Sequence, residues 1–452
     1  MRASCRLAVI LALLLAPRAA DADTEVRHEG KTLAEWIAQA RGKSADKARE
    51  AIRAVERARF LVDAPAVVVP ALVEILSTGN SVTGFTAVGA LASYGPLARD
   101  AVGALRSDAR ELDTARLAAR IRIGEGVAEG LRAWAEDADR QLATADKVTR
   151  GMKLPKAVEY ADTPFYYAMQ SVFLSLTAGG SLGLRGEGVA GFAGKVLRRP
   201  YGPLVASTVL WSAEDLGAAA APLAAGLVPF LKDTEPVNRL RAARALAWIP
   251  GLPPESTKQV LRSLSSAAHV PSLRSIVQGI AVTLNDPKDD VVTSLRGLAG
   301  HADRAIAAWA VAGLARRAVD REKILPVLLA NLKNADPDVR VAAADGLLSI
   351  GEWTDVTQAE ARKGLVDPDL RVRWRCGAIA ATAGGDVEPS LDAVALGIEG
   401  PDDVERVAAI EAARKLGSLA RPLRSHLKSW SELPCARIAE PARHALEAVG
   451  ED

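Results

Sequence analysis

Glycine recurs at a fixed interval in the C-terminal half of the chain. Gly351, Gly384, Gly417 and Gly450 lie 33 residues apart. The residues one, four and eight positions before them form three columns: Ile350, Ala383, Leu416 and Val449; Leu347, Ala380, Ala413 and Leu446; Ala343, Cys376, Ala409 and Ala442. These offsets trace one face of a 3.6-residue helix. Because one column is small, neighbouring helices can approach closely, so the spacing predicts a stack of similar helical units.

The same register continues upstream with other residues in the glycine position. We expect Gly95, Gly217, Pro250, Asn285 and Ala315 each to close a helix. Hydrophobic residues make up 49% of the chain but aromatic residues only 4%. Alanine, leucine and valine therefore supply most of the apolar surface, which suits closely packed helices better than a β-sandwich.

Charged residues form two more columns in the same register. Eleven positions before the closing residue stand Arg239, Arg274, Arg304, Arg340, Arg373 and Arg406, and fifteen before it stand Glu235, Asp336, Asp369 and Asp402. An acidic residue near a helix start can cap free backbone N–H groups. The arginine four residues later can reach that carboxylate or its counterpart on the next repeat. We interpret the columns as a structural ladder, with a catalytic or anion-binding row as the alternative.

The run Asp336-Pro-Asp-Val-Arg-x-x-Ala-Ala and the run Asp367-Pro-Asp-Leu-Arg resemble HEAT repeats. The resemblance is to the short HEAT-like type that is also seen in phycobilisome lyases. It implies an all-α fold, an α-solenoid in which antiparallel helix pairs form a right-handed superhelix. We expect the shape to be a rod-like curve with no central globular core, whose second helices line a long inner surface.

The N-terminus has the pattern of an export signal. Arg2 and Arg6 precede a short apolar run at 7–16, and a small-x-small cleavage site follows at 20–22. Removing residues 1–22 takes away three arginines and one aspartate, so the formal charge falls from +2 to zero. We therefore expect an exported protein, periplasmic or extracellular, that does not insert into a membrane once the signal is removed and does not bind nucleic acid.

The stretch 151–201 departs from the repeat pattern. It holds most of the chain's few tyrosines and phenylalanines, together with a glycine-rich run at 179–194. Such departures are where function more often lies. We therefore give Phe165, Tyr166 and Tyr167 as candidate partner-binding residues. The alternative is a divergent pair of helices whose aromatic side chains fill a gap.

Motifs that carry chemistry are weak in this sequence. Gly179-Gly-Ser-Leu-Gly and Gly186-Glu-Gly-Val-Ala-Gly match hydrolase and dinucleotide-binding patterns, but neither follows a predicted strand. The histidines lack metal-site spacing. Arg371, Arg373, Trp374 and Arg375 are interpreted as a solvated, salt-bridged helix start rather than a carbohydrate or nucleic-acid platform. We predict no catalytic residue, no cofactor and no metal, and we expect Cys376 to be a buried thiol.

The sequence divides into a signal peptide at 1–22, HEAT-like repeats at 23–150, a divergent aromatic and glycine-rich helical insertion at 151–216, and a repeat array at 217–452. The predicted function is an exported scaffold that binds a protein or peptide partner through its inner helical surface. The alternative is an enzyme or lyase-like protein whose site is formed by residues 151–201.

Overall fold

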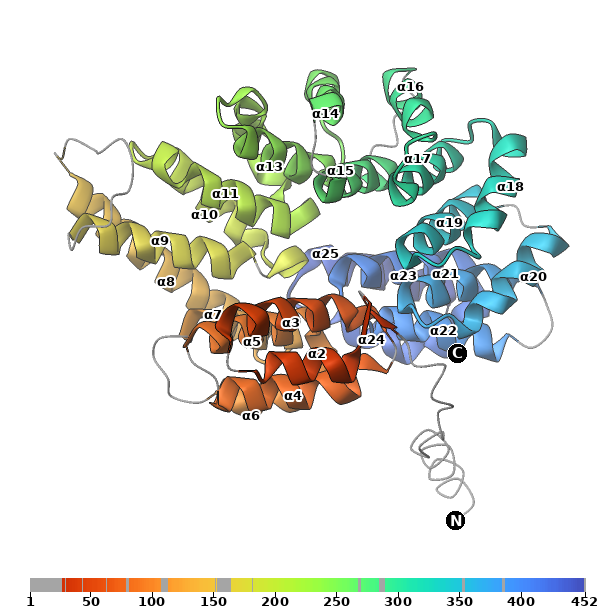
Figure 1. Cartoon of the computed structure of the whole chain (residues 1–452), viewed down its shortest axis with the longest axis horizontal. Coiled ribbons are helices and arrows are strands. Elements are labelled where there is room, and N and C mark those ends of the chain that lie inside the picture. Colours follow the sequence, from red (N-terminus) through yellow and green to blue (C-terminus); the bar gives the residue numbers. More distant parts are fainter. Residues whose placement is uncertain are drawn as a thin grey trace, which may run out of the picture.

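The computed structural model describes residues 27–28, 30–42, 44–61, 63–78, 81–106, 113–150, 152, 164–180, 182–266, 270–283, 289–351, 354–383 and 387–450. These residues form twelve consecutive helix pairs, α2/α3 to α24/α25 (Figure 1). In the described part of the chain, the only strands are β1 (Arg27–His28) and β2 (Lys31–Thr32), which pair antiparallel in front of α2. The expected all-α solenoid of helix pairs is therefore confirmed.

The first helix of each pair lies on the outside and the second on the inside. The first helices are α2 (Leu33–Ala40), α4 (Ala64–Thr78), α6 (Val102–Leu105), α8 (Val127–Thr149), α10 (Glu187–Leu197), α12 (Ala224–Leu227), α14 (Pro254–Ser266), α16 (Asp289–Leu298), α18 (Arg321–Asn331), α20 (Asp355–Lys363), α22 (Glu388–Ile398) and α24 (Arg424–Ser431). The second helices are α3 (Ala45–Arg57), α5 (Ser81–Ser93), α7 (Asp113–Ile123), α9 (Pro164–Gly180), α11 (Gly202–Leu216), α13 (Pro236–Ala247), α15 (Val270–Thr283), α17 (Arg304–Arg316), α19 (Pro337–Ile350), α21 (Leu370–Ala380), α23 (Asp403–Leu416) and α25 (Ala436–Val449). Short 3₁₀ turns join or extend them: η1 (Ala58–Phe60), η2 (Gly95–Ala101), η4 (Gly183–Arg185), η5 (Gly217–Leu223), η6 (Val228–Lys232), η7 (Gly364–Val366), η8 (Ala381–Ala383) and η9 (Gly417–Leu423).

The repeat columns explain where the helices end and how they pack. Helix α19 ends at Gly351 and α23 at Gly417, with backbone φ of +72° and +56°. A side chain disfavours that left-handed region, so glycine stops the helix there. Gly384 lies outside the described residues. The small column is buried throughout, with zero exposure for each of its members: Ala343, Cys376, Ala409 and Ala442.

The second helices form one continuous row from α3 to α25, because each contacts the second helix of the next pair. The segment 151–216, predicted as a divergent insertion, supplies two members of this row, α9 and α11. Its glycines allow close approach: a Cβ on Gly179 would lie 2.7 Å from the Trp134 ring, and one on Gly180 would lie 2.8 Å from Ser212 Cα. Gly179 and Gly180 therefore allow tight packing of α9 against α8 and α11, whereas Gly188 and Gly191 of the same run have open space around them.

The stretch Leu204–Lys232 is long enough and apolar enough to cross a membrane, judged by length and composition alone. The sequence analysis expected none after the signal. In the fold this stretch is α11, η5, α12 and η6, and its backbone turns at Gly217, where φ is +53°. Val209, Ala213 and Leu223 from this stretch are buried in the main core, as a core segment of the solenoid would be.

The array closes on itself, because its early and late repeats are in contact. The expectation of a rod-like curve is therefore wrong. Arg185 of η4 forms a bidentate ion pair with Asp403 of α23, with Nε–Oδ2 and Nη2–Oδ1 distances of 2.9 and 3.1 Å. Asp403 also pairs with Arg406, whose guanidinium lies 3.9 Å from the Trp430 ring. Residues 218 positions apart in sequence thus meet in a buried ion-pair cluster.

A second contact joins the first helices of the chain to the last repeats. Arg371 of α21 stacks on the ring of Phe60 at 4.4 Å, and Leu61 forms an isolated β-bridge with Asp369. Gly95 approaches Pro401 so closely that an added Cβ would lie 2.7 Å from the Pro401 carbonyl oxygen. The N-terminal helices therefore pack against α21 and the α22–α23 loop instead of only capping a free end, as Figure 1 shows for the red and blue segments.

Candidate functional site

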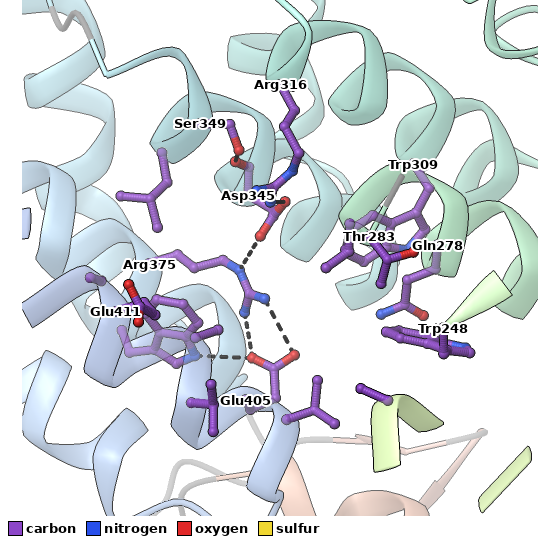
Figure 2. A pocket seen from close by; sticks show the side chains of 18 of the residues that line it. Trp248, Gln278, Thr283, Trp309, Arg316, Asp345, Ser349, Arg375, Glu405 and Glu411 are labelled. Atoms are coloured by element: carbon purple, nitrogen blue, oxygen red, sulfur yellow. Dashed lines mark hydrogen bonds and ion pairs between the residues drawn. The ribbon is translucent and has the colours of Figure 1, made fainter. Parts of the chain in front are cut away.

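The inner face of the closed array holds a pocket of about 320 Å³. Its walls come from the second helices α15, α17, α19, α21 and α23, from the end of α13, and from single residues of η4 and η5 (Figure 2). The residues that line the pocket do not belong to the three apolar columns of the repeat, which pack between the helices. The pocket volume is at the small end of the range of about 300–1,000 Å³ that is typical of ligand sites.

Three tryptophans give the pocket its apolar character. Trp248, Trp309 and Trp374 all line it. The indole N–H of Trp374 donates to Glu405 Oε2 at 3.1 Å, and that of Trp248 donates to Ser275 Oγ at 3.4 Å. These bonds fix the rings of Trp248 and Trp374. Trp309 and Trp374 are only 3% and 1% exposed, and the Arg375 guanidinium covers one face of Trp374 at 4.3 Å. Trp248 is therefore the one of the three whose ring is partly open to the pocket. Valine, leucine and alanine side chains complete this wall: Leu184, Val282, Leu348, Val404, Val407 and Ala408.

A buried network of charges crosses the opposite wall (Figure 2). Arg316 Nη2 lies 2.9 Å from Asp345 Oδ2, and Arg375 Nε lies 3.2 Å from Asp345 Oδ1. Arg375 also reaches Glu405, with an Nη1–Oε2 distance of 2.6 Å. The network joins α17, α19, α21 and α23, so it fixes how these four inner helices stand around the pocket.

Burial and charge act in opposite directions on this network. Burial alone would raise the pKa of Asp345, but Arg316 and Arg375 outweigh it and hold that pKa below its usual value. Burial alone would lower the pKa of Arg375, but Glu405 and Asp345 raise it. Asp345 and Arg375 therefore stay charged near neutral pH, and neither is suited to donate or accept a proton in acid–base chemistry.

Two polar groups of the pocket are not committed to the fold. The Gln278 amide, which Figure 2 places on the wall beside Trp248 and Trp309, forms no hydrogen bond within the described part of the chain. Lys415, in the last turn of α23, forms neither an ion pair nor a hydrogen bond with any described residue. These two side chains are free to contact a ligand.

The candidate partner-binding residues lie elsewhere. Phe165, Tyr166 and Tyr167 occupy the first turn of α9, away from the helices that form the pocket. The Tyr167 side chain is 55% exposed, whereas the side chains of Phe165 and Tyr166 lie outside the described residues. The structure does not bring these three residues to the pocket, and their role in binding stays a prediction.

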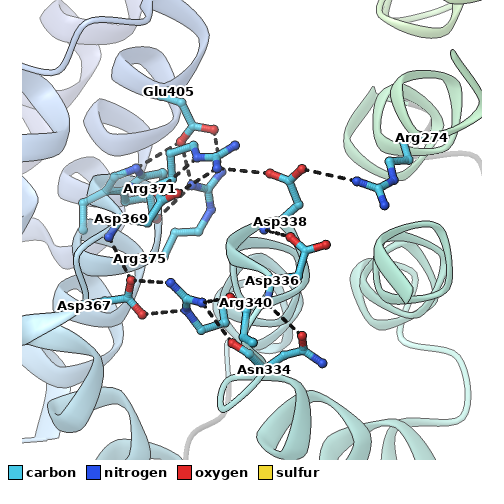
Figure 3. Close-up of polar contacts among 12 residues, drawn as sticks. Arg274, Asn334, Asp336, Asp338, Arg340, Asp367, Asp369, Arg371, Arg375 and Glu405 are labelled. Carbon is cyan, nitrogen blue, oxygen red and sulfur yellow. Dashed lines mark hydrogen bonds and ion pairs between the residues drawn. The ribbon is translucent and has the colours of Figure 1, made fainter. Parts of the chain in front are cut away.

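The charged columns lie at the starts of the second helices, and Figure 3 shows four of their members, Arg274, Asp336, Arg340 and Asp369. Asp336, Asp369 and Asp402 cap α19, α21 and α23 through their side chains, whereas Glu235 precedes α13 without a side-chain cap bond. The arginines do not pair with these caps four residues before them. Arg239 and Arg373 bond to carbonyls of the loop before their own helix.

Two of the arginines reach the next repeat. Arg274 forms a bidentate pair with Asp303, the cap of α17, and Arg340 does so with Asp367, two residues before the cap of α21. Asp338 extends the contacts, because it lies 3.1 Å from Arg371 and 3.9 Å from Arg274 (Figure 3).

The remaining two arginines differ from these. Arg304 is exposed at the start of α17, whereas Arg406 is fully buried in the cluster that closes the array. These arginines therefore occupy different environments and do not form one surface row.

The residues of the pocket were largely missed by sequence reasoning. Trp374 and Arg375 were assigned to a solvated helix start, but they are 1% and 3% exposed. The salt bridges that this interpretation predicted are present, but the predicted solvent exposure of Trp374 and Arg375 is wrong. The signal available in the sequence was that the equivalent positions of the neighbouring repeats, Val341 and Val407, are also apolar. Asp345 gave a weaker signal, as a charge within an otherwise apolar helix.

The cysteines and histidines form no metal site among the described residues. Cys376 is a buried thiol, as predicted. Cys435 is also buried, and its thiol donates to the Leu184 carbonyl at 3.3 Å. Burial, helped by the charge of Asp367, raises the pKa of Cys376 to about 12. A thiol held protonated in this way packs as a small apolar group and does not act as a nucleophile.

No known family and no curated protein sequence matches this chain. Among solved structures, an engineered protein is 16% identical over 92% of this chain and 98% of its own, with a TM-score of 0.34. Kap95 in a complex with Nup1 is 13% identical over 98% of this chain and 70% of its own, with a TM-score of 0.38. Kap95p from a structure of its binding to RanGDP gives 13% identity and a TM-score of 0.35. These TM-scores are too low to support the fold assignment, which therefore rests on the helix pairs described above.

Proposed function

We propose that this protein is a binding scaffold that holds a peptide segment of a partner in the pocket on its inner surface. The observation that carries this proposal is the pocket itself. Its wall presents three tryptophans and a set of aliphatic side chains, and its acidic groups are neutralised by arginines. A concave, mainly apolar site with few free polar groups is typical of ligand recognition, and aromatic side chains are frequent anchors for bound peptides.

The proposal also includes export. The pattern of charge, apolar run and small-residue site at residues 1–22 supports it, and these residues lie outside the described part of the structure. Expression in a bacterial host followed by mass spectrometry of the mature protein tests this point. A mature N-terminus at Asp23 is the expected result, and an unprocessed chain retained in the cytoplasm contradicts export.

The binding function is tested by filling the pocket. Ala408 is partly exposed on the pocket wall, so Ala408→Trp places a large ring in the space. The control is Val327→Trp on the outer helix α18, where the native side chain is already 43% exposed. Each variant is immobilised and exposed to a random peptide library. Retained peptides should be lost with Ala408→Trp and kept with Val327→Trp; equal retention by both variants contradicts the proposal.

The alternative of an enzyme with its site in 151–201 is not favoured by any specific observation. The described side chains of α9 and α10 pack into the main core, among them Met169, Leu176, Val189 and Phe192. The Trp134 indole N–H donates to the Ser175 carbonyl at 3.3 Å, so this hydrogen bond holds α8 against α9.

A further inference from the structure

One cation of the inner pocket forms no ion pair with any residue that the structure describes. The three carboxylates that line it are all paired. Asp345 and Glu405 contact Arg316 and Arg375 as described above, and Glu411 Oε2 lies 2.8 Å from Arg414 Nε. Because the pairs are complete, the carboxylates have little charge left for attracting a cationic ligand.

Lys415 is the remaining cation of the wall. It lines the pocket, it is exposed, and it has no carboxylate partner among the residues that the structure describes. A cation in the last turn of a helix is also favourable by itself, through the helix dipole, so the position alone does not show a ligand. The second observation is the surroundings of Lys415, an apolar pocket lined by Trp248, Trp309 and Trp374.

We propose that the pocket binds an apolar group that carries a carboxylate, and that this group is the C-terminal residue of a peptide. The apolar side chain lies against Trp248 and the aliphatic side chains of the wall, the α-carboxylate pairs with Lys415, and the Gln278 amide bonds to the peptide backbone. This inference rests on the proposed peptide-binding function and names the part of the peptide that is recognised. Capture of a chain terminus by charge is a recurring mode of peptide recognition.

The closure of the array supports a chain end over a chain middle. The contact of Arg185 with Asp403 and that of Phe60 with Arg371 join the two ends of the solenoid. An internal segment of a folded partner would have to thread into such an enclosure or open it. A free C-terminus can enter from one side, and the volume of about 320 Å³ fits one large side chain with its neighbours rather than a long segment.

The test uses three probes titrated into the full chain, with tryptophan fluorescence as the readout. They are N-acetyl-Gly-Gly-Phe with a free carboxylate, the same peptide as its C-terminal amide, and octanoate. The free acid should bind, and the amide should bind about tenfold more weakly, which is the effect of losing one charge-assisted contact. Tighter binding of octanoate than of the peptide acid would show a site for free acids and overturn the assignment to a peptide terminus.

Two variants test whether Lys415 causes the difference in affinity between the acid and the amide. Lys415→Met removes the charge and keeps the side-chain length, and it should weaken the acid about tenfold while leaving the amide unchanged. Lys323→Met, on the outer helix α18, is the matched control and should change neither. If acid and amide bind wild type equally, and Ala408→Trp abolishes both, the carboxylate inference is wrong while the peptide-binding function stands. If neither probe binds and the peptide library is not retained, both fail.

Discussion

The ion-pair cluster that closes the array can be broken with one isosteric change. In the variant Asp403→Asn, the amide keeps the shape of the side chain and removes its charge. Arg185 and Arg406 are both fully buried, and both pair with this carboxylate. Removing one member of a buried charge cluster leaves uncompensated charge in the interior, which costs about 3–5 kcal/mol.

Native-state hydrogen exchange of amides in η4 and α23 measures this cost locally. A loss of about 3 kcal/mol in the free energy of opening corresponds to exchange that is faster by roughly 150-fold. The control is Asp137→Asn, because Asp137 pairs with Arg140 on the surface of α8. A surface pair of this kind contributes about 0–1 kcal/mol. Unchanged exchange in Asp403→Asn would refute the view that this cluster holds the array closed.

The same cluster gives a pH dependence with a defined sign. Burial alone would raise the pKa of Asp403, but Arg185 and Arg406 hold it well below its ordinary value. The unfolded chain therefore binds the proton more readily than the folded one. The contribution of Asp403 to stability is fully present above its unfolded pKa of about 3.9 and is lost as the pH falls toward the folded pKa. Between about pH 5 and pH 2, wild type should lose more stability than Asp403→Asn.

Three further changes test the packing and the pocket. Gly180→Ala should destabilise by about 1–3 kcal/mol in urea unfolding, because its Cβ meets the backbone of Ser212, whereas Gly188→Ala has open space around it and serves as the control. Cys376 should resist a thiol reagent at pH 8 in the folded protein, because burial raises its pKa to about 12, and should react once urea unfolds the chain. Asp345→Asn should lower stability by about 3–5 kcal/mol in the same unfolding assay, because it leaves Arg316 and Arg375 without their shared counter-charge; an unchanged unfolding midpoint contradicts the network.

The short-range sequence pattern predicts the local structure of this chain. The columns at Ala343, Cys376 and Ala409 predict one buried face because small residues at a fixed helical offset have one main physical use, which is close packing. The glycine at 351 ends its helix because the left-handed backbone there disfavours a side chain. The buried face and the helix end both depend on residues within one repeat, so they can be predicted from the sequence directly.

The closure and the pocket depend on contacts between distant repeats, so no short-range pattern reports them. Nothing near Arg185 shows that its partner is Asp403, 218 residues later. The path of a solenoid accumulates from small rotations at each pair, and the sum decides whether its ends meet. Trp374 and Arg375 were placed on the correct helix but on a solvated surface, because their burial comes from α19 and α23, the second helices of the two neighbouring repeats.

Small-angle X-ray scattering of the mature chain tests closure most directly. A compact chain of this length has a radius of gyration of roughly 22 Å, and a closed array with a central pocket should lie only slightly above that value. Twelve helix pairs stacked at about 9 Å in an open rod would extend over roughly 100 Å and give a radius of gyration above about 30 Å. For wild type we predict a radius of gyration of roughly 22 Å, and for Asp403→Asn a larger value at neutral pH. A value above about 30 Å for wild type would contradict the closed array.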